Sequence, residues 1–300
     1  MNGTVVEEAM RKADVLIEAL PFLKQFHHAL TVVKIGGEAI EDAPTLRALL
    51  TDLVFLEQVG LRPILVHGGG ASISRALTAA GIEVVWNQGR RVTTPEAMEI
   101  VAREVERLNL HLVDQLFELG GAAVGLVPSR HFCIVHGEIH DPALGEVGAP
   151  VAVDRQRLTS FTSRGLIPVV PPLSLHADAR ILNTNADDIA LSVATAMGAA
   201  KLVFCSSVPG VLREQNDPAS RIPTLRREEV RSLVDDGTIS GGMIPKVESC
   251  LAALEAGVAK IHIVHAATAH ALLLEIFTAE GVGTELVADA PATTRRVRAR

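Results

Sequence analysis

The chain has 300 residues and a formal net charge of −7, with 48% hydrophobic and 21% charged residues. This composition excludes an intrinsically disordered chain, and the acidic balance argues against nucleic acid as a partner. We expect no membrane partner and a cytoplasmic location, because no run of eighteen apolar residues and no signal-peptide pattern occurs, and because Cys133, Cys205 and Cys250 are widely spaced.

The first half of the chain opens with a predicted helix and then alternates strands with helices. Apolar residues recur at helical spacing over residues 5–20, and Pro21 is expected to end that helix. Residues 1–30 therefore read as a helical arm. Further helices are predicted at 43–59, 71–81, 95–119 and 154–164, and strands at 31–35, 63–66 and 167–170, with a hairpin-like alternation over 132–139.

The second half continues the same alternation. Helices are predicted at 186–197, 227–235, 245–256 and 270–278, and strands at 201–205 and 260–264. Strands that alternate with helices predict a three-layer α/β/α sandwich with a mainly parallel central sheet. The proline pair 171–172 is the best internal hinge, so we expect two lobes, residues 31–175 and 176–300.

Glycine-rich turns follow two consecutive predicted strands. Lys34 is followed by Ile35-Gly36-Gly37, and His67 is followed by three glycines, of which Gly69 and Gly70 open a helix. Such turns let backbone N–H groups approach an anion, although a single glycine turn is more often simple geometry. Neither turn matches the P-loop or dinucleotide fingerprint. Because burying an ammonium group is costly, Lys34 favours a bound anion over a snorkelling lysine.

A second group of polar residues follows at 183–188 and 246. Asn185 and its neighbours could serve as a plain helix cap, yet two amides and two carboxylates exceed what capping requires. Lys246 stands in the first turn of a helix, where a cation opposes the helix dipole unless a polyphosphate is bound. Arg91 could form a two-pronged bond with a carboxylate. Together these residues suit phosphoryl transfer, which depends on positioning and charge neutralisation.

The order of these motifs resembles the amino acid kinase family over about residues 13–287. The segments VVKIGGEAI, LVHGGG, GRRVT, LNTNADDIA, VPGVL and ISGGMIPKVESCLAALEAGV stand in the family's order and spacing. The chain looks most like the members that use ATP with Mg²⁺ to phosphorylate the γ-carboxylate of N-acetyl-L-glutamate, the second step of arginine biosynthesis.

The resemblance also implies roles for individual residues. Lys34 and Lys246 would neutralise the phosphates, and Asp187 would orient both lysines. The acceptor would meet a set of binding residues made of Gly69, Gly70, Arg91, Asn183 and Asn185. The nucleotide would meet Gly36, Gly37, Ser206, Ser207, Pro209, Gly210, Gly241, Gly242 and Met243. No dedicated protein metal site is expected.

Both ends of the chain resemble the arginine-inhibited members of the family. KADVLIEALPFLKQF is similar to the helix that interlaces dimers into a hexamer, a trimer of dimers, so a homo-oligomer is implied. HALLLEIFTAEGVGT is similar to an arginine-binding segment, with His270 and Glu280 as candidate ligands. A PII-type protein is a further implied partner. The alternative is that the N-terminal helix packs on its own subunit.

Two other functions stay open at this level. The acceptor could be acetylaminoadipate, aspartate or glutamate, since residue spacing does not reveal pocket depth. The chain could also be a catalytically weak arginine-sensing homologue, because Ser206-Ser207 stands where the family usually has Thr-Asp or Ser-Asp.

Overall fold

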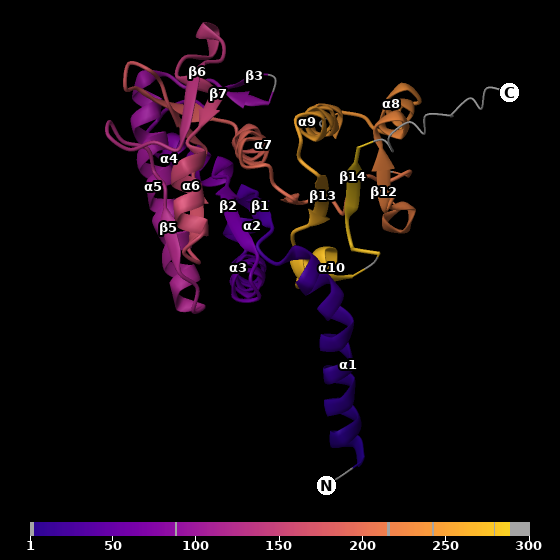
Figure 1. Ribbon diagram of the computed structural model, residues 1–300. Coiled ribbons are helices and arrows are strands. Elements are labelled where there is room, and N and C mark those ends of the chain that lie inside the picture. Colours follow the sequence, from indigo (N-terminus) through magenta and orange to yellow (C-terminus); the bar gives the residue numbers. More distant parts are fainter. Residues whose placement is uncertain (1–2, 88, 215–216, 242, 279, 289–300) are drawn as a thin grey trace, which may run out of the picture.

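An eight-stranded sheet forms the centre of the molecule in the computed structural model, which describes residues 3–87, 89–214, 217–241, 243–278 and 280–288 (Figure 1). The strand order is β12-β14-β13-β11-β1-β2-β8-β5, and every neighbouring pair is parallel except β13 and β14. The strands are β1 (Leu30–Ile35), β2 (Arg62–His67), β5 (Ala123–Gly125), β8 (Ile167–Val170), β11 (Lys201–Ser206), β12 (Thr224–Arg226), β13 (Lys260–His265) and β14 (Thr284–Val287). The predicted mainly parallel sheet is confirmed.

Helices cover both faces of this sheet. Successive side chains of β1 point to opposite faces of the sheet, and both faces are apolar: Val32 packs into one hydrophobic core and Val33 into the other. The first core joins α6 (Arg155–Thr162), α7 (Ala186–Met197), α8 (Arg227–Asp235) and α9 (Met243–Glu255). The second joins α3 (Ala43–Gln58), α5 (Pro95–Glu118) and α10 (Ala271–Phe277). Helix α4 (Gly70–Ala79) packs on α5, and α2 (Gly37–Glu41) follows β1.

Two smaller β structures lie beside the main sheet. Strands β6 (Val135–Ile139), β7 (Val147–Val153), β9 (Leu173–Leu175) and β10 (Ile181–Thr184) close into a small barrel. The stretch predicted as hairpin-like, residues 132–139, contributes β6, and its antiparallel partner β7 lies beyond that stretch. Strands β3 (Trp86–Asn87) and β4 (Arg90–Arg91), with two residues each, pair antiparallel to form a short β-ribbon. The sequence analysis did not identify β3, β4, β9 or β10, because two to four residues are too few for a periodic pattern. It also missed β7, whose sequence VGAPVAV does not alternate between apolar and polar residues.

The N-terminal helix α1 (Gly3–Phe26) projects from the body of the molecule (Figure 1). The prediction that Pro21 ends this helix is wrong, since Pro21 lies inside it. Proline leaves the carbonyl of Ile17 without its helical donor, but Ile17 is exposed, so water can satisfy that oxygen. At the far end the ring of Phe26 lies 4.7 Å from the Lys201 ammonium, which fixes the helix to the sheet.

One continuous sheet connects the two halves of the chain. Strand β1 pairs with β2 from the first half and with β11 from the second. Pro171 and Pro172 lie between β8 and β9, and both are buried. Within the described part of the chain, no helix is both long and apolar enough to span a bilayer.

Candidate active site

A carboxylate held between two lysines forms the centre of the site. Oδ1 of Asp187 lies 2.7 Å from the Lys34 ammonium, and Oδ2 lies 3.5 Å from the Lys246 ammonium. Lys34 comes from β1, Asp187 from the first turn of α7, and Lys246 from the first turn of α9. The structure therefore brings together three residues that are up to 212 positions apart in the sequence.

The electrostatic environment keeps Asp187 ionised. Burial by itself would raise the pKa of Asp187, but the ammonium groups of Lys34 and Lys246 outweigh that effect and hold the pKa below its usual value. The side chains of Lys34, Lys246 and Asp187 are 14%, 19% and 30% exposed, so solvent reaches the cluster. Two cations against one anion leave a local positive charge that suits a polyphosphate.

The two glycine turns approach each other next to Lys34. A Cβ atom on Gly37 would lie 3.2 Å from the backbone nitrogen of Gly70, and one on Gly36 would lie 3.9 Å from the Lys34 ammonium. Gly36 and Gly69 precede α2 and α4 as cap residues without side chains, so the first N–H groups of both helices can face an anion. The glycines permit this close approach of two backbones.

His67 stabilises the second glycine turn through hydrogen bonds, and the sequence analysis gave this residue no role. Its Nδ1 bonds to the carbonyl of Gly68 at 2.9 Å, and its Nε2 accepts from Asn109 Nδ2 at 3.1 Å. Asn109 also donates to the carbonyl of Val169. Burial lowers the pKa of His67 to about 4, so the ring is neutral at pH 7. The signal in the sequence was a histidine at the end of a buried strand.

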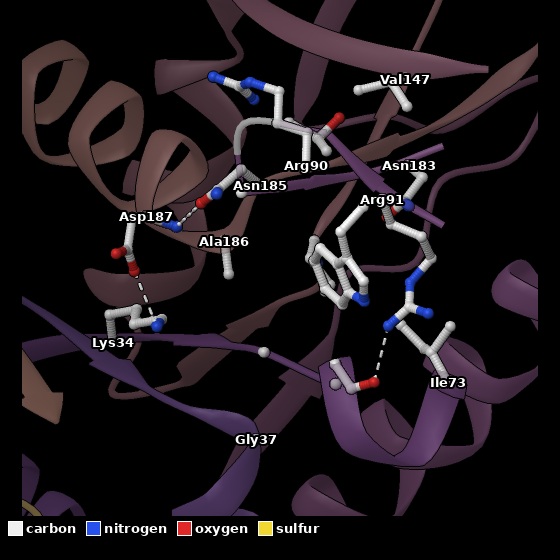
Figure 2. A pocket seen from close by; sticks show the side chains of 17 residues that line it. Lys34, Gly37, Ile73, Arg90, Arg91, Val147, Asn183, Asn185, Ala186 and Asp187 are labelled. Carbon is white, nitrogen blue, oxygen red and sulfur yellow. Dashed lines mark hydrogen bonds and ion pairs between the residues drawn. The ribbon is translucent and has the colours of Figure 1, made fainter. Parts of the chain in front are cut away.

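A cavity of about 280 Å³ opens beside Lys34 and Asp187 (Figure 2). All five predicted acceptor ligands line this cavity: Gly69, Gly70, Arg91, Asn183 and Asn185. Trp86 and Arg90 from the β3–β4 ribbon also line it, and neither was predicted.

Arg91 is almost fully buried in the wall of this cavity. One of its terminal nitrogens, Nη2, donates to the carbonyl of Gly70 and to the hydroxyl of Ser74, both at 2.8 Å. The indole ring of Trp86 covers the guanidinium at 4.5 Å. The other terminal nitrogen, Nη1, is buried with no hydrogen-bond partner among the residues that the structure describes. A buried donor without a partner favours binding of an acceptor atom from a ligand.

Two asparagines fix the backbone around the cavity: Asn183 in β10 and Asn185, which precedes α7. Asn183 Nδ2 donates to the Thr93 hydroxyl at 3.0 Å, and that hydroxyl donates to the carbonyl of Arg91 at 2.9 Å. Asn185 caps α7, since its Oδ1 accepts from the backbone N–H of Asp187 at 2.7 Å. The cap therefore fixes the backbone that carries the central carboxylate.

The predicted nucleotide residues lie at the carboxyl end of β11 and around the start of α9. Ser206 ends β11 next to β1, and Ser207 is exposed beyond it. Pro209 is partly buried, and Gly210 has a φ of 129° against Thr284. Gly241 is exposed and Met243 begins α9, while Gly242 lies outside the described residues. The described residues of segments 206–210 and 241–243 lie at the same carboxyl end of the sheet as Lys34 and do not line the acceptor cavity, whereas Gly37, which was also predicted to bind the nucleotide, does line it.

The two predicted arginine ligands are separated from each other. His270, in the left-handed conformation at φ 57°, caps α10 and its Nδ1 lies 2.7 Å from the buried carboxylate of Asp52 in α3. Glu280 lines a different cavity of about 160 Å³ between α1 and the last strands. The pair was expected to act together, and the structure places only Glu280 at this cavity.

A buried ionic cluster in the Glu280 cavity was not predicted from the sequence. The Lys201 ammonium lies 3.2 Å from His262 Nε2, and His262 Nδ1 lies 2.7 Å from Glu275. Glu275 also accepts from the backbone N–H groups of Val282 and Gly283. Burial lowers the pKa of Lys201 to about 8. The signal in the sequence was that His262 stands within an otherwise apolar run, IHIV, of the kind found in strands that are buried on both faces.

Comparisons with known proteins identify the family of the chain. The model of the amino acid kinase family matches residues 29–265. The chain is 40% identical over 293 residues to an acetylglutamate kinase of Methanosphaera stadtmanae, covering 93% of this chain and 98% of that protein.

Two solved structures of N-acetylglutamate synthase from Neisseria gonorrhoeae share the fold at 24% identity. One is complexed with coenzyme A and N-acetyl-glutamate, with a TM-score of 0.82 over 93% of this chain and 64% of that chain. The other is complexed with coenzyme A and L-arginine, with a TM-score of 0.79 over 93% and 66%. The chain thus spans slightly less than two thirds of the length of these synthases.

Proposed function

The chain belongs to the amino acid kinase family, and from this premise we propose that it is an acetylglutamate kinase of arginine biosynthesis. It transfers the γ-phosphoryl group of ATP to the γ-carboxylate of N-acetyl-L-glutamate. The observation that carries this proposal is the arrangement of Lys34 and Lys246 around Asp187, in a chain that matches an acetylglutamate kinase over almost its whole length.

The reaction needs charge neutralisation rather than a general base. The acceptor carboxylate is already ionised at pH 7, so one of its oxygens attacks the γ-phosphorus directly. That bond forms while the bond between the γ-phosphorus and its bridging oxygen breaks, which leaves an acyl phosphate and ADP. Lys34 and Lys246 would offset the charge on the transferring group, and Asp187 would keep the two ammonium groups apart and oriented.

The acceptor would occupy the cavity lined by Arg91 and Asn183. Nη1 of Arg91, which has no hydrogen-bond partner among the described residues, supports a bond to the α-carboxylate, and the backbone N–H groups of Gly69 and Gly70, which line the cavity, would donate to an oxygen of the same ligand. Asn183 would contact the acetamido group, and Asn185 would border the site from the cap of α7. The cavity volume of about 280 Å³ suits a small amino-acid derivative.

The nucleotide would lie across the carboxyl ends of β1 and β11. The backbone at Gly36 and Gly37 would face its phosphates, and the segments 206–210 and 241–243 would border the remainder. Asp187 is already engaged by two lysines, so a divalent ion fits on the ATP oxygens rather than on this carboxylate. Mg²⁺ bound in this way would supply further neutralisation of phosphate charge.

We further propose that L-arginine inhibits the enzyme through the cavity at the base of α1. This cavity is lined by Phe22 and Phe26 of α1, by the carboxylates of Glu280 and Glu285, and by Lys260. Carboxylates suit a guanidinium group, and ammonium groups suit an α-carboxylate. Glu280 would bind directly, whereas His270 would act through the position of α10, which it caps.

The remaining expectations are assembly, partner and location. The exposed apolar residues of α1, among them Met10, Leu16 and Ile17, support a homo-oligomer, either a dimer or a hexamer made of three dimers. A PII-type protein is proposed as a partner from the resemblance alone. Three free, buried cysteines support a reducing, cytoplasmic setting.

A coupled assay of ADP release tests the function, run with N-acetyl-L-glutamate, acetylaminoadipate, aspartate and glutamate as acceptors. We expect turnover with N-acetyl-L-glutamate at a kcat/KM well above that for the other three, and hydroxylamine should trap the acyl phosphate. Preference for another acceptor would replace the proposed substrate, and absence of turnover with all four would overturn the enzyme assignment. The same assay with added L-arginine tests the inhibition.

A further inference from the structure

The β3–β4 ribbon closes one side of the acceptor cavity, although it has little structure of its own. Among the described residues, its strands are joined by two residue pairs, Trp86 with Arg91 and Asn87 with Arg90, and by one backbone hydrogen bond just beyond them, from Val92 to Val85. An isolated ribbon of this size is not stable by itself, so its position must depend on contacts to neighbouring elements. The side chains of β4 supply two such contacts.

Consecutive residues of a strand point to opposite sides, and β4 uses both sides as anchors. Arg91 extends toward α4, where it bonds to Gly70 and Ser74. Arg90 extends the other way, and its Nη1 lies 2.8 Å from Oδ2 of Asp188 in the first turn of α7. Figure 2 shows the two guanidinium groups on opposite sides of the strand.

The ion pair between Arg90 and Asp188 also separates two spaces. Arg90 lines the acceptor cavity on one side and a groove of about 580 Å³ between β7, α7 and α9 on the other. The two side chains are 21% and 27% exposed, so they are shielded more than a typical surface pair. Asp188 directly follows Asp187, which means that the pair connects the ribbon to the helix turn that carries the central carboxylate.

We propose that the Arg90–Asp188 ion pair is a latch that holds the β3–β4 ribbon closed over the acceptor cavity and thereby positions Arg91 for the acceptor carboxylate. Arg90 and Asp188 are positioning residues, since they act through Arg91 and the ribbon. This proposal rests on the proposed function for its kinetic consequences, but the closed position of the ribbon can be measured without any substrate.

The chain provides its own reporter for this measurement. Trp86 is its single tryptophan, and the chain has no tyrosine, so its intrinsic fluorescence comes from the ribbon itself. The indole is 54% exposed and lies 4.5 Å from the Arg91 guanidinium. Opening of the ribbon would expose the indole further, which increases quenching by acrylamide and shifts the emission to the red.

The test compares Arg90→Gln, Asp188→Asn and the double variant with the wild-type chain. Each single variant should increase acrylamide quenching without substrates and raise the KM for N-acetyl-L-glutamate roughly five- to tenfold, more than it changes kcat or the KM for ATP. The double variant should be no worse than the singles, since both singles remove the same interaction. Asp188→Glu keeps the charge and should recover most of the affinity.

Arg157→Gln is the matched control, because it removes an ion pair of 3.1 Å between Arg157 of α6 and Asp154, the residue that caps this helix, and neither residue belongs to the ribbon. Unchanged quenching in both single variants, or additive increases in KM in the double variant, would overturn the latch. A fall in kcat with unchanged acceptor KM would likewise count against it, since it would mean that Asp188 acts on the charge of Asp187. If circular dichroism shows that Asp188→Asn does not fold, the quenching and the KM of Arg90→Gln alone test the latch. Increased quenching in a chain that does not phosphorylate N-acetyl-L-glutamate would support the latch and refute only the proposed substrate.

Discussion

Replacing Asp187 by asparagine tests the central feature of the site. Asparagine keeps the shape of the side chain and removes its charge, which leaves two ammonium groups close together with no anion between them. We expect the variant to fold, because the cap of α7 comes from Asn185 and the core side of the helix is unchanged. The loss should appear in turnover, since the lysines would no longer be held in their positions.

The size of the loss follows from the two distances. At an effective dielectric constant of about 20, attraction over 2.7 Å and 3.5 Å amounts to about 6 and about 5 kcal/mol. Desolvation of the three groups and screening at 14–30% exposure offset most of this gain. A net loss of about 2 to 3 kcal/mol in transition-state stabilisation corresponds to a decrease in kcat of roughly 30- to 150-fold.

The assay is ADP release at saturating ATP and N-acetyl-L-glutamate, with circular dichroism to verify folding. Asp42→Asn is a matched control, because Asp42 is also an acid at a helix N-terminus, where it caps α3, and asparagine caps equally well. This control should keep wild-type turnover. If Asp187→Asn kept kcat within about threefold of the wild type, the reasoning that Asp187 positions the two lysines would be refuted.

Three further predictions concern the glycine turns, pH and the N-terminal helix. Gly37→Ala should lower activity more than Gly70→Ala, because an added Cβ meets the nitrogen of Gly70 at 3.2 Å in the first case and no atom of the described residues within 4 Å in the second. Steady-state kinetics of both variants test this. The folded chain takes up a proton on His67 only near pH 4, whereas the unfolded chain does so near 6.5, so acidification over this window should destabilise the fold by up to about 3 kcal/mol. Denaturant titrations from pH 7 to 4 measure this, and His67→Asn should show a weaker pH dependence; equal dependence would disprove the role of the ring. Deletion of residues 1–25 should abolish inhibition by arginine and reduce the oligomer, measured by the kinase assay and by size-exclusion chromatography; unchanged inhibition would contradict the proposed role of α1.

Much of the main sheet could be predicted from the sequence because its signals are local. The buried strand at 63–66 is a continuous apolar run, and the one at 31–35 is apolar apart from Thr31 and Lys34. The helix at 186–197 has its cap, its periodicity and its terminal glycine in one window. The rule that ligands bind beyond the carboxyl ends of parallel strands then placed Lys34 and the glycine turns at one sheet edge, as the structure has them.

Other features depend on contacts that no sequence window contains. Strands β9 and β10 have three and four residues, and they exist because they pair with each other and with β6 and β7. Likewise, the sequence suggested that Pro21 ends α1, whereas an exposed helix surface lets water replace the missing bond. Local preference was outweighed in both cases by the surroundings.

The sequence by itself determined the residue types of the site: two lysines, an aspartate, an arginine and paired glycines in a fixed order along an α/β chain. Only the tertiary structure decided which groups meet, namely that one carboxylate contacts both ammonium groups and that Arg90 reaches Asp188. It also decided that the Arg91 guanidinium lies under Trp86 with one nitrogen that has no partner in the described part of the chain. The physical reason is that periodicity and capping act over a few residues, whereas distances between side chains depend on how whole helices and strands pack.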